Sequence, residues 1–137
     1  MQILLDFRSK IPIYIQIMDQ IKHLIAVGVL HPGDQLPTVR DLAADLDVNF
    51  TTVARAYRLL DEEGLISTQH GRGTYILPLP DGRSEGDFRR EDLERLARHF
   101  LKEAARLGYN PDEVSGILKD NIYLWDTEGS PPAEHHE

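Results

Sequence analysis

Two short helical patterns separated by only a three-residue turn are the strongest constraint on how this chain folds. The first pattern ends at Leu46 and opens on Thr38 and Asp41, which form an S/T-x-x-D/E capping box. Asp47-Val48-Asn49 predicts a tight turn, with Asn49 as the N-cap of the second helix. Two short helices joined so closely must cross each other and pack on a third element, as in a helix-turn-helix.

The flanking segments supply that third element and a hairpin. A helix is expected to begin at Pro12, since proline is favoured at the first helical position, and to end at Gly28. After the helix pair, strand-like runs at 65–68 and 74–77 flank a glycine-containing tip. This order of elements predicts a mainly α fold with a small β-hairpin (α+β): a winged helix-turn-helix.

A polar linker follows from Pro78 to about Phe88 and leads to two amphipathic helices. The first is expected over 90–107. The second starts at Asn110, where a cap, a proline and an acid follow one another. The tail after Thr127 is proline-rich and polar, so we expect it to be disordered.

The helix after the tight turn has two chemically different sides. Apolar residues line the inner side, whereas Thr51, Arg55 and Arg58 lie on the other side. Small hydrogen-bonding residues near the N-terminus and cations further along suit a helix in a DNA major groove. Arg72, between two glycines at the hairpin tip, suits a narrow minor groove or a phosphate.

Four stretches, in order, resemble the DNA-binding domain of the GntR family of bacterial transcription factors: residues 12–17, 32–43, 48–57 and 71–76. In that family, operator contacts come from an arginine of the second helix, the first turn of the third helix and the wing. With the cations of the third helix, the candidate DNA-binding residues are Arg40, Asn49, Phe50, Thr51, Thr52, Arg55, Arg58, His70, Gly71 and Arg72.

Two of these candidates carry an open alternative. Arg40 contacts a phosphate or pairs with Asp41 or Asp45. Phe50 stands where many family members have arginine or another polar residue. Its ring either touches a thymine methyl or folds back onto the second helix.

The C-terminal part resembles the YtrA-type subfamily, whose short two-helix tail serves dimerisation. We therefore expect a winged helix-turn-helix domain at 1–79 and a linker, two-helix dimerisation region and tail at 80–137. The alternative is that these helices pack back on the chain's own first helix. The candidate dimerisation residues are Leu93, Leu96, Phe100, Ala104, Leu107, Ile117 and Trp125.

Composition narrows the function classes. The chain has no cysteine and no spacing typical of a metal, catalytic or cofactor site, so we expect neither an enzyme nor a bound metal or cofactor. The net charge of −8 is concentrated in residues 78–137, which hold 8 basic and 14 acidic residues. No apolar run approaches 18 residues, so we expect a cytoplasmic protein without membrane contact.

These patterns predict a sequence-specific transcription regulator, most simply a repressor, acting as a homodimer on a palindromic double-stranded operator. A small-molecule effector is a further expected partner, of a class that the sequence does not specify. The alternative function is a winged-helix module for protein–protein interaction without DNA binding. Its support is the negative net charge.

Overall fold

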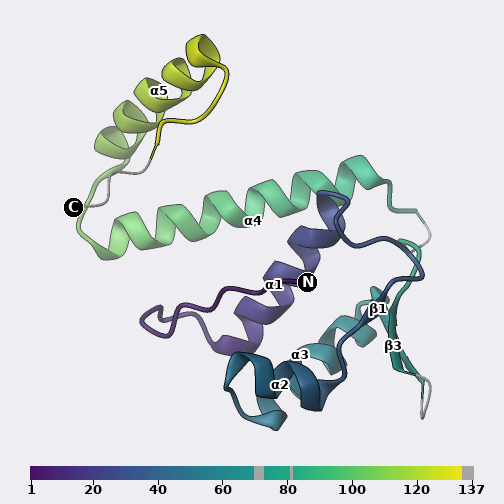
Figure 1. The fold of residues 1–137 in the computed structure, drawn as a ribbon. Helices are drawn as coiled ribbons and strands as arrows, with labels where there is room; N and C mark the ends of the chain where they lie inside the picture. Colours follow the sequence, from purple (N-terminus) through teal and green to yellow (C-terminus); the bar gives the residue numbers. More distant parts are fainter. Residues whose placement is uncertain (70–72, 81, 134–137) are drawn as a thin grey trace. The chain divides into compact units, whose positions relative to one another are not determined.

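The computed structural model describes residues 1–69, 73–80 and 82–133 and divides into two compact units, Met1–Asp92 and Leu93 onward. The mainly α fold with a small sheet is confirmed. The elements in chain order are α1 (Ile13–Ala26), β1 (Gln35–Leu36), α2 (Val39–Leu46), α3 (Phe50–Glu62), β2 (Ile66–Gln69), β3 (Gly73–Ile76), α4 (Glu85–Arg106) and α5 (Pro111–Glu128). Figure 1 labels all of them except β2.

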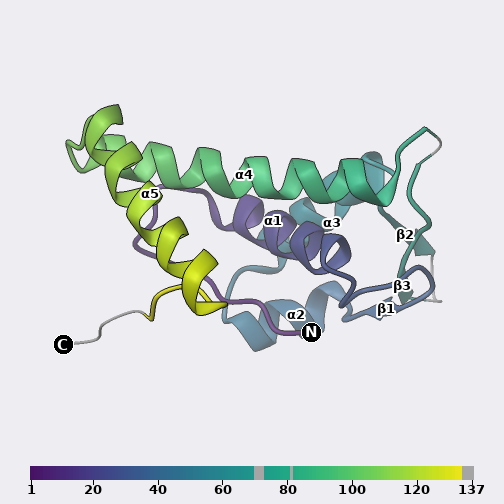
Figure 2. The same cartoon turned by 90° about the horizontal axis from the view of Figure 1, so that it is seen from above.

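The first unit is built around α3, which packs against both α1 and α2. One continuous apolar core joins the three helices to the sheet, and Figure 2 shows the strands gathered at one side of the helices. The largest fully buried side chains of this core are Tyr57, Ile17, Ile21, Leu60, Ile66, Ile76 and Val53. Burial of these side chains is the main force that holds the helix pair in place.

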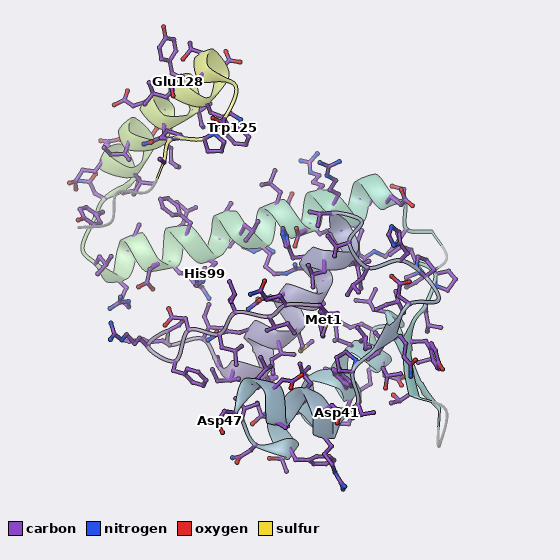
Figure 3. All side chains as sticks on the ribbon, viewed as in Figure 1. Met1, Asp41, Asp47, His99, Trp125 and Glu128 are labelled. Atoms are coloured by element: carbon purple, nitrogen blue, oxygen red, sulfur yellow. The ribbon has the colours of Figure 1, made fainter. Side chains whose placement is uncertain are left out.

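The helix boundaries agree with the sequence at most ends. Thr38 caps α2, because its hydroxyl accepts a hydrogen bond of 3.0 Å from the Asp41 N–H. Asp47 ends α2 in the left-handed conformation, at φ 54°, and Figure 3 labels Asp41 and Asp47 near the two ends of this helix. The start of α1 was placed one residue early: Pro12 is the N-cap, with an extended ψ of 144°, and the helix begins at Ile13.

The sheet has one strand more than the predicted hairpin. Its order is β1-β3-β2 and all pairing is antiparallel. Leu36 of β1 lies opposite Thr74 of β3, and Ile76 both accepts from the Gly33 N–H and donates to Asp34 O, at 2.8 Å each. A strand of two residues is too short to show an alternating sequence pattern. Only its pairing with β3 identifies it as a strand.

The predicted linker is shorter in the structure, because α4 begins at Glu85 rather than Arg90. The Ser84 hydroxyl accepts a hydrogen bond of 3.0 Å from the Asp87 N–H in the first turn. Phe88, expected at the end of a polar linker, is only 3% exposed and belongs to the core of the first unit. Burial of this ring explains why the helix extends through a polar, glycine-containing stretch.

The N-terminal segment is attached to α1 by two glutamine side chains one turn apart. The Gln20 amide accepts from the Leu4 N–H at 2.7 Å and donates to Leu4 O. The Gln16 amide does the same with Asp6, accepting at 2.9 Å and donating at 3.0 Å. Each amide thus replaces the peptide group of a neighbouring strand, and Ile3 is buried beside the core.

In the second unit, α5 starts as predicted. Asn110 accepts from the Glu113 N–H at 2.9 Å, and the Glu113 carboxylate accepts from the Asn110 N–H at 3.2 Å. The helix continues to Glu128, one residue beyond the expected end, and no residue of α5 is buried. Within the described ranges, no helix combines the length and apolar character that crossing a membrane requires.

Candidate nucleic-acid interface

The inner side of α3 is fixed by burial and by one buried hydrogen bond. Val53, Ala56, Tyr57 and Leu60 are all at most 2% exposed. The Tyr57 hydroxyl donates to Pro37 O at 2.7 Å, which ties α3 to the segment before α2. Burial raises the pKa of Tyr57 well above its ordinary value of 10, so the phenol stays protonated and donates. The helix therefore presents its remaining side to solvent in one orientation.

The first turn of α3 leaves polar groups open. Asn49 is the N-cap, as predicted, but its side chain makes no capping hydrogen bond. Its carbonyl accepts from the N–H groups of Thr52 and Val53, at 3.1 and 3.4 Å. Within the described residues the N–H groups of Phe50 and Thr51 have no backbone acceptor. Two N–H groups at a helix N-terminus are suited to bind a phosphate oxygen.

The side chains of this turn are accessible to a ligand. Thr51 is exposed and Thr52 is half-buried. Phe50 is 54% exposed, which leaves most of its ring open to solvent. Together with the Asn49 amide, which makes no capping hydrogen bond, the turn offers a hydrogen-bonding group, a hydroxyl and an apolar surface to one partner.

The three candidate arginines of the helix pair differ in their surroundings. Arg40 on α2 is exposed and has no ion pair within the described part of the chain. The Arg55 guanidinium carbon lies 3.9 Å from the centroid of the Tyr14 ring. Arg58 pairs with Glu62 at 3.5 Å, and both side chains are more than half exposed. Of these three arginines, Arg40 and Arg55 are the two without a carboxylate partner among the described residues.

Glu62 is a residue of this surface that the sequence reasoning missed. It lies one turn beyond Arg58 on the same side of α3. The i,i+4 spacing of opposite charges was the available signal. We call the exposed residues Thr51, Arg55, Arg58 and Glu62 the outer face of α3.

The base of the hairpin is fixed to α3. The Asp61 carboxylate accepts from the Thr68 hydroxyl at 2.8 Å and from the Thr68 N–H at 3.3 Å. This contact joins the end of α3 to β2, the strand that leads to the tip. His70, Gly71 and Arg72, the predicted contacts at the tip, lie outside the described residues.

The predicted dimerisation residues are mostly exposed within their own unit. Leu93, Leu96, Phe100, Leu107, Ile117 and Trp125 are exposed, and Figure 3 labels Trp125 on α5. Ala104 is the exception, at 9% exposure. It lines an apolar groove of about 500 Å³ whose other lining residues include Leu107 and Val114.

A helix held by two others with one open side, beside a three-stranded wing, defines a winged helix-turn-helix protein of the DNA-binding class. Residues 13–76 match the family model described as "Bacterial regulatory proteins, gntR family". The chain belongs to this GntR family of DNA-binding transcription regulators, and the resemblance seen in the sequence is confirmed.

Individual relatives support the same assignment. The HTH-type transcriptional repressor YtrA of Bacillus subtilis is 51% identical over 72 residues, which are 53% of this chain and 55% of that protein. The match therefore spans about half the length of that relative. The uncharacterized HTH-type transcriptional regulator YhcF of Bacillus subtilis is 36% identical over 116 residues, 83% of this chain and 93% of YhcF.

A solved structure extends the likeness beyond the winged helix. The GntR family transcriptional regulator from Listeria monocytogenes superimposes with a TM-score of 0.60 at 35% identity. The match covers 83% of this chain and 98% of that one. The match to YtrA is consistent with the YtrA-type subfamily. The named relatives are transcription regulators rather than enzymes.

Proposed function

We propose that this GntR-family protein is a sequence-specific repressor that binds a palindromic operator as a homodimer. The observation that carries the proposal is the first turn of α3. Among the described residues it combines two N–H groups without a backbone acceptor, an Asn49 side chain that makes no capping hydrogen bond, and an exposed Thr51. Such a turn satisfies both needs of a recognition helix, which are anchoring to phosphate and reading of base edges.

The contacts divide into two kinds. Asn49, Phe50, Thr51 and Thr52 enter the major groove, where the exposed Phe50 ring meets a thymine methyl. Arg40 and Arg55 neutralise phosphates, since neither is paired with a carboxylate in the described part of the chain. The wing residues His70, Gly71 and Arg72 take the adjacent minor groove or backbone in this proposal.

Dimerisation is supported by the composition of the second unit. A helix of 18 residues with no buried residue and with Ile117, Ile122 and Trp125 exposed leaves a large apolar surface in water. Covering it with a second copy gives an isologous interface and a two-fold axis. Residues 1–79 then form the DNA-reading domain and residues 80–137 the dimerisation region. Two reading domains one helical turn apart match a palindrome.

The repressor role rests on similarity to YtrA, a protein named as a transcriptional repressor. A dimer seated on an operator that overlaps a promoter excludes polymerase by occupancy alone. The proposal therefore needs no surface other than the reading domain and the dimerisation region.

A mobility-shift titration with the region upstream of the protein's own gene tests the proposal. Arg40, Arg55 and Arg72 in each subunit neutralise about six phosphates per dimer, so the log–log salt slope should be about −5. Arg40→Ala should weaken binding to every duplex, whereas Thr51→Ala should change base preference. Absence of any shift, on this region and on a randomised pool, would refute the proposal and favour the alternative of a protein-interaction module.

A further inference from the structure

The stretch that begins α1 belongs to the family match but has no part in the contacts proposed above. Tyr14 is the second residue of α1 and is half-buried. Its ring lies against the guanidinium of Arg55 from the middle of α3, 3.9 Å from ring centroid to guanidinium carbon. The first turn of α1 therefore reaches the outer face of α3.

Stacking of this kind keeps an arginine ready to bind. A ring contacts the flat face of the guanidinium and leaves the N–H donors at its edge free. The ring is neutral, so it holds the cation without cancelling its charge. The Glu62 carboxylate does the opposite to Arg58, because its negative charge offsets that of the guanidinium 3.5 Å away. In the protein without DNA, Arg55 thus keeps its full positive charge, whereas the charge of Arg58 is offset by a carboxylate.

We propose that Tyr14 is a positioning residue for DNA binding: its ring holds the Arg55 guanidinium with its N–H edge directed to a phosphate of the operator. The proposal rests on the proposed function and adds α1 to the elements that build the interface. An unsupported arginine must give up side-chain freedom when it binds, whereas the stacked one has already done so. Loss of the Tyr14 ring should therefore lower the affinity for DNA only when Arg55 is present.

The size of the effect is bounded by the usual strength of an exposed cation–π contact, because the ring can hold the guanidinium in place by no more than that energy. Loss of the ring should weaken binding about two- to fivefold in each subunit, and hence roughly four- to twenty-five-fold for a dimer. Tyr14→Phe keeps the ring and should bind within about twofold of the unchanged protein. Arg55→Lys should respond less to loss of the ring, because an ammonium group does not stack flat.

A double-mutant cycle on the full chain tests this inference. The variants are Tyr14→Phe, Tyr14→Leu, Arg55→Ala and the combination of Tyr14→Leu with Arg55→Ala. The probe is the tightest duplex that the unchanged protein selects from a randomised pool of about 30 base pairs. Tyr14→Leu should weaken binding in the presence of Arg55 and have no further effect once Arg55 is alanine.

Thermal unfolding of each variant, with Ile25→Ala at the other end of α1 as a half-buried control, separates positioning from destabilisation. Ile25→Ala should lower the Tm while leaving the affinity of the folded protein unchanged.

If Arg55→Ala binds like the unchanged protein, the Arg55 contact in the proposed function is wrong. If Arg55→Ala weakens binding but Tyr14→Leu acts equally in both backgrounds, only the positioning role is overturned. A loss in Tyr14→Phe equal to that in Tyr14→Leu would also overturn it, because the hydroxyl rather than the ring would then act.

Discussion

Glu62 provides a sharp test of how the outer face of α3 meets DNA. Its carboxylate lies 3.5 Å from the Arg58 guanidinium, and both side chains are more than half exposed. Glu62→Gln removes the negative charge and keeps the shape of the side chain. An exposed i,i+4 pair stabilises a helix by only about 0.3–0.5 kcal/mol, so the fold should be retained. We expect tighter binding of DNA, because Arg58 becomes available to a phosphate and a repelling charge disappears.

The magnitude follows from the number of cations released. One additional phosphate contact per subunit makes two per dimer, and each steepens the log–log salt slope by about 0.9. The slope should therefore become more negative by about 2. Between about 50 and about 200 mM salt, the variant should lose roughly tenfold more affinity than the unchanged protein, starting from a tighter Kd at low salt.

The assay is fluorescence anisotropy with one labelled operator duplex over that salt range. Glu94→Gln is the matched control, because Glu94 faces Arg98 in a similar i,i+4 pair at 3.6 Å and the change in net charge is the same. Glu94 lies on α4 in the second unit, outside the proposed interface. A slope equal to that of the control would refute the idea that the outer face of α3 lies at the phosphate backbone.

Three further changes have defined outcomes. Tyr57→Phe removes the hydroxyl that donates to Pro37 O and should lower the free energy of unfolding by about 1–3 kcal/mol in urea. Because the pKa of Tyr57 is raised in the folded state, the unfolded chain loses this proton at a lower pH than the folded protein does. The free energy of unfolding should therefore fall as pH rises above 10, and it should fall less in Tyr57→Phe. Asn110→Ala removes the cap of α5 and should reduce stability by about 1 kcal/mol in thermal unfolding, an idea contradicted by an unchanged Tm. Ile117→Asp should give monomers in sedimentation and weak DNA binding, whereas Tyr123→Asp, on another side of α5, should remain dimeric.

Much of the fold could be predicted because local chemistry and burial agree. Thr38 and Asn110 cap helices as their sequence patterns predict, since a side-chain acceptor beside free N–H groups acts within one turn. The helical spacing of the apolar residues of α3 predicted which side of this helix is buried, for the same local reason. The pairing of β1 and the burial of Phe88 were not visible, because each depends on a partner distant in the chain.

The candidate interface could be predicted only as a set of residues. Which arginine is stacked and which is paired depends on contacts between elements and on neighbours just beyond the motif. Arg55 meets Tyr14 across 41 positions of the chain, a separation that no periodicity reports. The pair of Arg58 with Glu62 is local and was open to detection from spacing. The tip residues His70 to Arg72 stay a prediction, since they lie outside the described residues.

The positions of α3 that hold it in the fold and the positions that face solvent do not overlap. Val53, Ala56, Tyr57 and Leu60 carry the packing, and none of them is exposed. Mutational freedom on the solvent side is therefore large, because substitutions there leave the core volume unchanged. Descendants of one ancestral gene could acquire new target sites through a few exchanges at exposed positions such as Phe50 and Thr51 with little change in stability. The same separation makes this helix a practical position for engineering regulators with chosen operators.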